Sequence, residues 1–136
     1  SVIEALAPAG RRFCAVMAPG NRPDSHFEEC AAILAGHFDQ FVCYEHDKYR
    51  RGKPPGEIAA RLSNGLAAAG AGSILMAASG SEAATIIAAA AEPGDFVVVF
   101  GWNVTNSVEH YRAAFRDVGK LAPVQPPRGR RRETFA

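Results

Sequence analysis

The sequence predicts an open α/β sheet that is mostly parallel and carries helices on both faces. Four short apolar runs alternate with four stretches in which apolar residues recur at helical spacing. Each helical stretch has roughly 10–15 residues, the usual length of a crossover between neighbouring strands. Parallel strands joined by right-handed crossovers satisfy this alternation, which gives three layers, α/β/α.

The first strand and helix lie in residues 13–38. Residues 13–17 (Phe-Cys-Ala-Val-Met) form an apolar run stopped by Pro19 and Gly20, as expected for a strand buried on both faces. Residues 25–28 read Ser-x-x-Glu, which predicts a capping box at the start of the helix. The apolar positions that follow at helical spacing are Phe27, Cys30, Ala31, Leu34 and Phe38.

Residues 41–44 predict the second strand, and the polar residues 46–55 predict a long loop after it. The next helix follows this loop, and we expect Gly70 and Gly72 to end it. Its apolar positions include Ile58, Leu62 and Leu66.

The second half of the chain repeats the pattern. Residues 73–77 predict the third strand, and Ser81 is the expected cap of the helix after it, which Pro93 and Gly94 end. Residues 96–100 (Phe-Val-Val-Val-Phe) are the strongest strand signal. The apolar positions of the last two helices are Ala83, Ile86, Ile87 and Ala90, then Val108, Tyr111, Phe115 and Val118.

Charge divides the chain into a body and a tail. The net charge is +1, but residues 121–136 alone carry four Arg and one Glu, which leaves −2 on the other 120 residues. Such a body is not a nucleic-acid-binding domain by charge. No apolar run approaches the ~20 residues of a membrane span. We expect one domain over residues 11–120, the end of a linker at 1–10 and a flexible basic tail at 121–136.

Ligands of open α/β sheets bind beyond the carboxyl ends of the strands, which singles out three loops: residues 18–24, 46–56 and 79–81. In the first, Gly20, Arg22 and the free N–H groups of a helix start suit a phosphate or carboxylate, or form only a turn that Asp24 or Ser25 caps. The second places four cations in residues 48–53, which suit an anion or form an ordinary solvated loop.

No catalytic signature stands out in the sequence. Gly-x-Ser-x-Gly is absent around residues 79–81, and there is no P-loop sequence. Cys14, Cys30 and Cys43 lack zinc-site spacing and are expected to be reduced core residues of a cytoplasmic protein. The four histidines also lack a metal-ligand spacing, so we expect no metal site in this chain.

Four segments in order resemble the C-terminal domain of Mur ligases, and most closely that of the cyanophycin synthetases. Residues 18–24 (Ala-Pro-Gly-Asn-Arg-Pro-Asp) stand where that family tends to have Ala-Pro-Gly-Asp-Arg-Arg-Asp. Phe38-Asp39 precedes the second strand, and residues 51–57 resemble an Arg-Gly-Arg-x-x-Gly-Glu pattern. Pro93-Gly-Asp95 completes the set, so the resemblance spans about residues 10–101.

The resemblance implies a Rossmann-like domain that closes over a central ATPase domain of the same polypeptide. In such ligases ATP phosphorylates a carboxylate, and the amine of an incoming amino acid attacks the acyl phosphate. The P-loop and the Mg²⁺ ligands lie in the central domain, so ATP and Mg²⁺ would be bound mainly outside this chain. The resemblance therefore implies part of a larger cytoplasmic ligase, with no activity in this chain alone and no nucleic-acid or membrane partner.

By the same resemblance, the residues that face substrate or nucleotide are Asn21, Arg22, Asp24, Arg51 and Lys53. Arg22 would be a cation for a carboxylate or phosphate, and Asp24 would meet a cationic group or cap its helix. Asn21 replaces the usual Asp, and Lys53 replaces Arg with loss of bidentate geometry. The resemblance to cyanophycin synthetases, whose Mur-like half attaches arginine to an aspartate side chain, would imply arginine as the amino acid joined, and both departures weaken that expectation.

Two other readings stay open at the level of sequence. The chain could be a non-catalytic α/β binding or interaction module for an anionic ligand or a partner domain. It could also be an inactive relative of the ligases, with Asn21 marking the lost function. A Gly-Lys-Ser/Thr sequence after a strand in the upstream coding region would favour the ligase.

Overall fold

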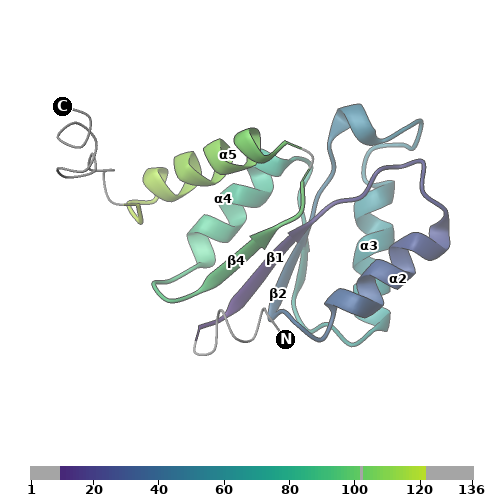
Figure 1. Cartoon of the computed structure of the whole chain (residues 1–136), viewed down its shortest axis with the longest axis horizontal. Helices are drawn as coiled ribbons and strands as arrows, with labels where there is room; N and C mark the ends of the chain where they lie inside the picture. Colours follow the sequence, from purple (N-terminus) through teal and green to yellow (C-terminus); the bar gives the residue numbers. More distant parts are fainter. Residues whose placement is uncertain (1–9, 102, 122–136) are drawn as a thin grey trace, which may run out of the picture.

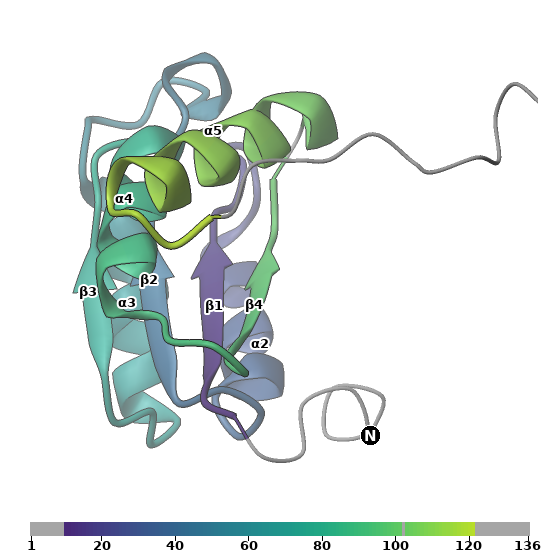
Figure 2. The ribbon, with the colours of Figure 1, turned by 90° about the vertical axis from the view of Figure 1, so that its left-hand side faces the viewer.

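The predicted fold class is confirmed. The computed structural model describes residues 10–101 and 103–121, which form a parallel four-stranded sheet between two helical layers (Figures 1 and 2). The elements in chain order are β1 (Arg12–Val16), α2 (Asp24–Leu34), β2 (Gln40–Cys43), the 3₁₀ turn η1 (Asp47–Tyr49), α3 (Glu57–Ala68), β3 (Ile74–Met76), α4 (Gly80–Ala90), β4 (Phe96–Val99) and α5 (Val104–Asp117). Residues 1–9 of the predicted linker (1–10) and residues 122–136 of the predicted tail (121–136) lie outside the described residues.

The strand order is β3-β2-β1-β4, so β1 lies inside the sheet and β4 at one edge. Cys14 of β1 stands opposite Phe41 of β2 on one side and Val98 of β4 on the other. This position explains why the first apolar run is buried on both faces, as predicted, whereas the β4 residues are half-buried. The chain leaves β1 and β4 toward opposite faces of the sheet, which makes their carboxyl ends a topological switch point.

The two helical layers differ in their side chains. Helices α2 and α3 cover one face of the sheet, and α4 and α5 cover the other (Figure 1). The α2–α3 layer packs through large buried residues, among them Phe27, Leu62 and Leu66. The α4–α5 contact is made of alanines, Ala84, Ala88 and Ala114. Small side chains let these two helices approach closely, but they bury less apolar area in the α4–α5 layer.

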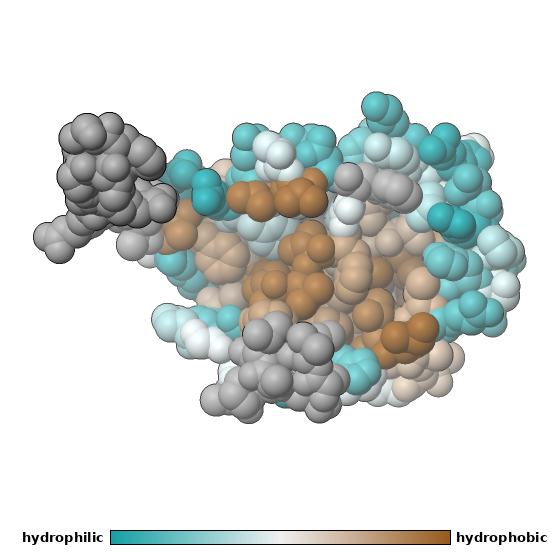
Figure 3. All heavy atoms as spheres, viewed as in Figure 1, coloured by the Kyte–Doolittle hydropathy of each residue, from teal (hydrophilic) through white to brown (hydrophobic). Residues whose placement is uncertain are grey.

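Exposed apolar residues gather along β4 and α5. Figure 3 shows them as a brown band over this side of the molecule. A groove of about 310 Å³ runs between the edge strand and the helix, lined mainly by valines and aromatic residues. Val104 is 76% exposed and the β4 residues are half-buried, so apolar surface of the described residues remains accessible on this side.

Two capping predictions are wrong. Helix α2 begins at Asp24, its N-cap is Pro23, and no side chain caps it, so neither Asp24 nor the Ser25 box caps the helix. The extended backbone of Pro23 lets the helix start two residues earlier than the box requires. Helix α4 is capped by Ser79, whose Oγ accepts a hydrogen bond from the Glu82 N–H at 3.1 Å, and not by Ser81.

Other sequence predictions hold or need only small changes. Gly70 follows the end of α3 with a φ of +94°, as a helix-ending glycine should. Helix α2 ends at Leu34, so Phe38 is a buried residue between elements and not part of the helix. Cys14 and Cys43 are buried free thiols as predicted, whereas Cys30 is only half-buried.

Candidate functional site at the carboxyl edge of the sheet

The loops after β1 and β2 are held against each other at the carboxyl edge of the sheet. The Gly20 N–H donates a hydrogen bond of 2.8 Å to the carbonyl of Tyr49. A Cβ atom on Gly20 would lie 1.7 Å from the carbonyl oxygen of Arg50, which only glycine avoids. Gly20 therefore allows the backbone of the neighbouring loop, and not a ligand, to approach closely. The Gly20 N–H is already hydrogen-bonded within the chain.

Glu45 anchors the loop after β2, and no sequence pattern predicts this role. Its side chain is 3% exposed and accepts hydrogen bonds from the Gly56 and Ala59 N–H groups at 2.9 Å and from Arg50 Nε at 3.1 Å. Burial raises the pKa of this carboxyl group, but the two backbone donors and the Arg50 guanidinium lower it further, so the net pKa lies below its usual range. Glu45 thus ties the start of α3 to the end of β2.

The four cations of residues 48–53 have different surroundings. Arg50 pairs with Glu45 and with Asp47 and is part of the internal structure of the loop. Arg51 is exposed, adopts a φ of +54°, and its guanidinium lies 5.7 Å from the centre of the Tyr49 ring. Lys53 is half-buried, with its ammonium 3.9 Å from Glu57.

The first loop directs its polar side chains in different directions. Asn21 and Arg22 are exposed, and Arg22 makes no side-chain hydrogen bond or ion pair with the described residues. Asp24 instead pairs with Arg61 of α3 at 2.9 Å, on the α2–α3 side of the molecule. The structure therefore brings Arg22, Arg51 and Lys53 to neighbouring loops of one edge, and it separates Asp24 from them.

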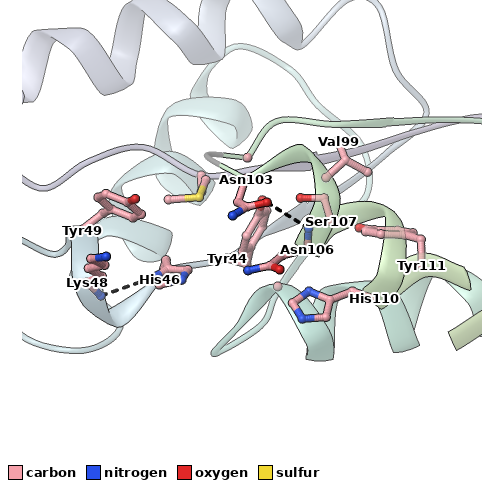
Figure 4. A pocket seen from close by; sticks show the side chains of 13 residues that line it. Tyr44, His46, Lys48, Tyr49, Val99, Asn103, Asn106, Ser107, His110 and Tyr111 are labelled. Atoms are coloured by element: carbon pink, nitrogen blue, oxygen red, sulfur yellow. Dashed lines mark hydrogen bonds between the residues drawn. The ribbon is translucent and has the colours of Figure 1, made fainter. Parts of the chain in front are cut away.

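A pocket of about 220 Å³ opens at the same edge, between the loop after β2 and the starts of α4 and α5 (Figure 4). Met17 and Val99 supply apolar surface at the ends of β1 and β4. The polar groups that line the pocket are the side chains of Tyr44, His46, Lys48, Tyr49, Asn103, Asn106, Ser107, His110 and Tyr111. Its position at the switch point between β1 and β4 is where an open α/β sheet binds its ligands.

The wall of the pocket opposite Lys48 is built from helix starts. Asn103 caps α5 by accepting a hydrogen bond from the Asn106 N–H at 3.0 Å, and the first turn of α5 holds no acidic residue. A Cβ on Gly101 would lie 2.9 Å from the Ser107 Oγ, and one on Gly80 would lie 3.3 Å from the Tyr44 ring. These two glycines allow the helix starts to close around Tyr44.

Two tyrosines lie at the base of this wall. The Tyr44 hydroxyl donates a hydrogen bond of 2.5 Å to the Phe100 carbonyl, and burial raises the pKa of Tyr44 to about 12. Burial also raises the pKa of Tyr111, whose hydroxyl has no hydrogen-bond partner among the described residues. Both phenol groups are therefore neutral at pH 7. The buried Tyr111 hydroxyl has no hydrogen bond from the described residues that would offset its loss of hydration.

His46 is oriented by the backbone of its own loop. Its Nδ1 accepts a hydrogen bond of 3.1 Å from the Lys48 N–H. A nitrogen that accepts carries no proton, so the neutral ring holds its proton on Nε2. His46 thereby presents an N–H donor beside the Lys48 ammonium (Figure 4).

None of the five residues expected to face substrate lines this pocket, although Lys48 and Tyr49 come from a loop that the sequence singled out. The sequence prediction covers the loops after the first three strands and not the one after β4, so it does not include the α5 side of the pocket. The pattern Gly101-x-Asn103 after the strongest strand, followed by Ser107 and His110 one turn apart, could have indicated it. Among the described residues, no three His, Cys, Asp or Glu side chains gather as a metal site would require.

Comparison with known proteins defines the family. A family model described as "Mur ligase, glutamate ligase domain" matches residues 1–103, and the chain belongs to this family. A solved structure of UDP-N-acetylmuramoyl-L-alanyl-D-glutamate–2,6-diaminopimelate ligase has the same fold, with a TM-score of 0.71 at 17% identity. The match covers 87% of this chain but 26% of that structure, so the chain spans about a quarter of its length. No curated protein matches by sequence.

Proposed function

We propose that this chain is the C-terminal, substrate-closing domain of an ATP-dependent acid–amino-acid ligase of the Mur and cyanophycin synthetase group. The observation that carries the proposal is a small, polar pocket at the carboxyl edge of the sheet, in a chain of the Mur ligase family. A volume of about 220 Å³ is below the roughly 300–1,000 Å³ of pockets for drug-sized ligands, which suits an amino acid better than a nucleotide.

The proposed reaction has two steps, and this domain contributes to the second. A central domain of the same polypeptide holds ATP and Mg²⁺ and transfers the γ-phosphoryl group to the acceptor carboxylate. The pocket then holds the incoming amino acid so that its amine attacks the acyl phosphate, and phosphate leaves. Orientation of the amine against the acyl carbon is the contribution that such a pocket makes to the rate.

In this proposal two exposed cations and one half-buried cation of the two neighbouring loops meet the phosphates. Arg22, Arg51 and Lys53 present positive charge at the edge that would close on the ATPase domain, and Asn21 lies beside Arg22. Asp24 contributes through its ion pair with Arg61, which fixes the start of α2. We assign Mg²⁺ to the central domain, as the family resemblance implies.

We also assign the protein to the cytoplasm, where ATP is present and free thiols such as Cys14 and Cys43 persist. In the part of the chain that the structure describes, no helix has the length and apolar character needed to cross a membrane.

The test uses the longer polypeptide that carries this chain. Amino-acid-dependent release of phosphate from ATP should appear in that protein and stay at background in the chain alone. Arg22→Ala should lower kcat/KM by about tenfold or more, since a charge-assisted contact to an anion is worth roughly 1.5–3 kcal/mol. Arg116→Ala, an exposed cation in the last turn of α5, is the matched control. An upstream region without a P-loop, or ligase activity in the chain alone, contradicts the proposal.

A further inference from the structure

Strand β4 directs part of its backbone toward an open edge of the sheet. It pairs with β1 on one side, and no described strand lies on its other side. The Phe96 and Phe100 N–H groups donate hydrogen bonds of 2.8 and 2.9 Å to carbonyls of the β1 segment. Because the backbone groups of a strand alternate in direction, the N–H and C=O groups of Val97 and Val99 point away from β1. These two residues can therefore pair with a further strand.

The sequence of β4 does nothing to prevent such pairing. Residues 96–99 (Phe-Val-Val-Val) contain no charged residue and no proline, which are the usual means of protecting an exposed edge. The opposite edge of the described sheet is β3, which has only three residues and so offers a shorter ladder. Strand β4 is thus the edge better suited to extend the sheet.

The exposed apolar side chains are concentrated on the same segment. Eight large apolar residues are exposed in the described chain, and five of them lie after β4, on α5 or directly after α5: Phe100, Val104, Val108, Val118 and Leu121 (Figure 3). The groove of about 310 Å³ between β4 and α5 has no charged residue in its described lining. A continuous apolar surface of this kind is typical of a protein–protein interface.

The free groups of β4 are self-complementary under a two-fold axis. If the axis passes beside Val98, Val97 of each copy lies opposite Val99 of the other copy. Such opposed residues of antiparallel strands exchange N–H···O=C bonds in both directions. The side chains of Val97 and Val99 pack on the α4–α5 face of the sheet, so those of both copies would meet beneath the two α5 helices. A contact of this kind uses the β4 edge of both copies and closes at two.

We propose that β4 and α5 form the interface of a symmetric dimer, in which two copies of this chain join their sheets edge to edge. A second copy matches this face in both respects, since it brings the complementary backbone groups and the same uncharged apolar surface. The interface consists of a four-residue strand and one side of a 14-residue helix, which is small for a stable dimer. We therefore expect a Kd of roughly 1–100 µM. The inference does not depend on ligase activity.

The first test follows the mass of the 136-residue chain by sedimentation up to about 500 µM. The mass should rise toward twice the 14.4 kDa of one chain. Val97→Pro removes an N–H that β1 does not use, so the sheet should persist while each dimer loses two donors. We expect Kd to rise by about tenfold or more. Val97→Ala, which shortens the same side chain but keeps the N–H, should weaken the dimer less.

A second variant tests the helix side of the interface. Val104→Asp places a charge on a residue that is 76% exposed, and an acidic residue in the first turn favours α5 itself. Its dimer should also weaken by about tenfold or more, because the charge would lose its hydration. Ile33→Asp alters an equally apolar residue of α2, 69% exposed, and should leave Kd unchanged. Circular dichroism checks that each variant is folded, and if Val97→Pro unfolds, Val104→Asp decides.

Amide hydrogen exchange then identifies the paired strand. In the dimer, the amides of Val97 and Val99 should exchange more slowly than in the dilute monomer. A chain that stays monomeric at about 500 µM overturns the proposal and leaves this face to another segment or domain. Assembly beyond two copies, a dimer that Val104→Asp does not weaken, or fast exchange of both amides in the dimer also overturns it.

Discussion

The two walls of the pocket are built in opposite ways. On one side, the loops after β1 and β2 are locked together by the Gly20–Tyr49 hydrogen bond and by the buried Glu45 carboxylate. On the other side, Gly80 and Gly101 let the starts of α4 and α5 close around Tyr44, and the two helices pack through alanines further along, beside an apolar groove. We call these the loop wall (residues 45–56, supported from behind by the neighbouring loop 18–22) and the helix wall (residues 79–82, 101 and 103–111).

Because of this difference, the charged groups and the neutral hydrogen-bond donors lie on two walls that differ in how easily they adjust. The loop wall carries the cations, and a charge is useful for recognition only if its position is fixed in advance. The helix wall carries the neutral donors on a layer that buries less large apolar surface, and such a layer can adjust at lower cost. The comparison predicts that substitutions that unlock the loop wall cost much more stability than those that alter the helix wall.

The largest effect is expected for Gly20→Ala. The added Cβ would lie 1.7 Å from a backbone oxygen, so the two loops must separate and lose their hydrogen bond. We expect a loss of about 3 kcal/mol or more in the free energy of unfolding. Gly36→Ala is the control, because a Cβ there meets nothing within 4 Å. Urea unfolding of both variants measures the difference, and equal midpoints would show that the loops are not locked.

The second effect is that of Glu45→Ala, which leaves Arg50 and two backbone N–H groups without their acceptor. We expect a loss of about 2–4 kcal/mol at pH 7, against little change for the exposed Glu29→Ala. Because the folded-state pKa of Glu45 is lowered, its contribution is complete above the unfolded pKa of about 4.3 and disappears as the pH falls through the folded value. The gap between wild type and variant should therefore shrink below about pH 4, and a constant gap would contradict the assigned charge.

On the helix wall, Ser79→Ala should cost about 1 kcal/mol, because it removes the cap of α4. Ser81→Ala is the matched control, since the Ser81 hydroxyl does not cap the helix, and it should change stability by less than about 0.5 kcal/mol. Thermal unfolding of the two variants gives the comparison. A larger loss for Ser81→Ala would reverse the assignment of the cap.

The smallest effect has the opposite sign. Tyr111→Phe removes a buried hydroxyl that has no partner among the described residues. We expect this variant to be as stable as the wild type or more stable, by up to about 1 kcal/mol. A clear loss of stability in chemical unfolding would mean that the hydroxyl is satisfied in the free chain.

The sequence predicted the fold well because its signals are local. Apolar runs and helical spacing identified the four strands and four α-helices of residues 10–101 and 103–121, and the order of elements implied the parallel sheet. The caps were less predictable, since Ser79 and Ser81 have the same chemistry and only the backbone geometry decides between them. The resemblance identified the family, which the family model confirms over residues 1–103.

The pocket was only partly predictable, because it depends on contacts between distant segments. The position of residues 46–56 after the second strand predicts a ligand-facing loop. Nothing in the local pattern shows that Glu45 turns inward to bind the start of α3. Likewise, Tyr44 reaches Phe100 across 56 positions of sequence. Such contacts follow from the strand order, in which β1 separates β2 from β4.

The most direct test of the account is the pair of Michaelis constants of the longer enzyme carrying Lys48→Ala, one for the amino acid and one for ATP. If the carboxyl-edge pocket holds the incoming amino acid, its KM should rise by about tenfold or more, while the KM for ATP stays at the wild-type value. Arg116→Ala should change neither constant. An unchanged KM for the amino acid, or a rise confined to ATP, would contradict the central claim.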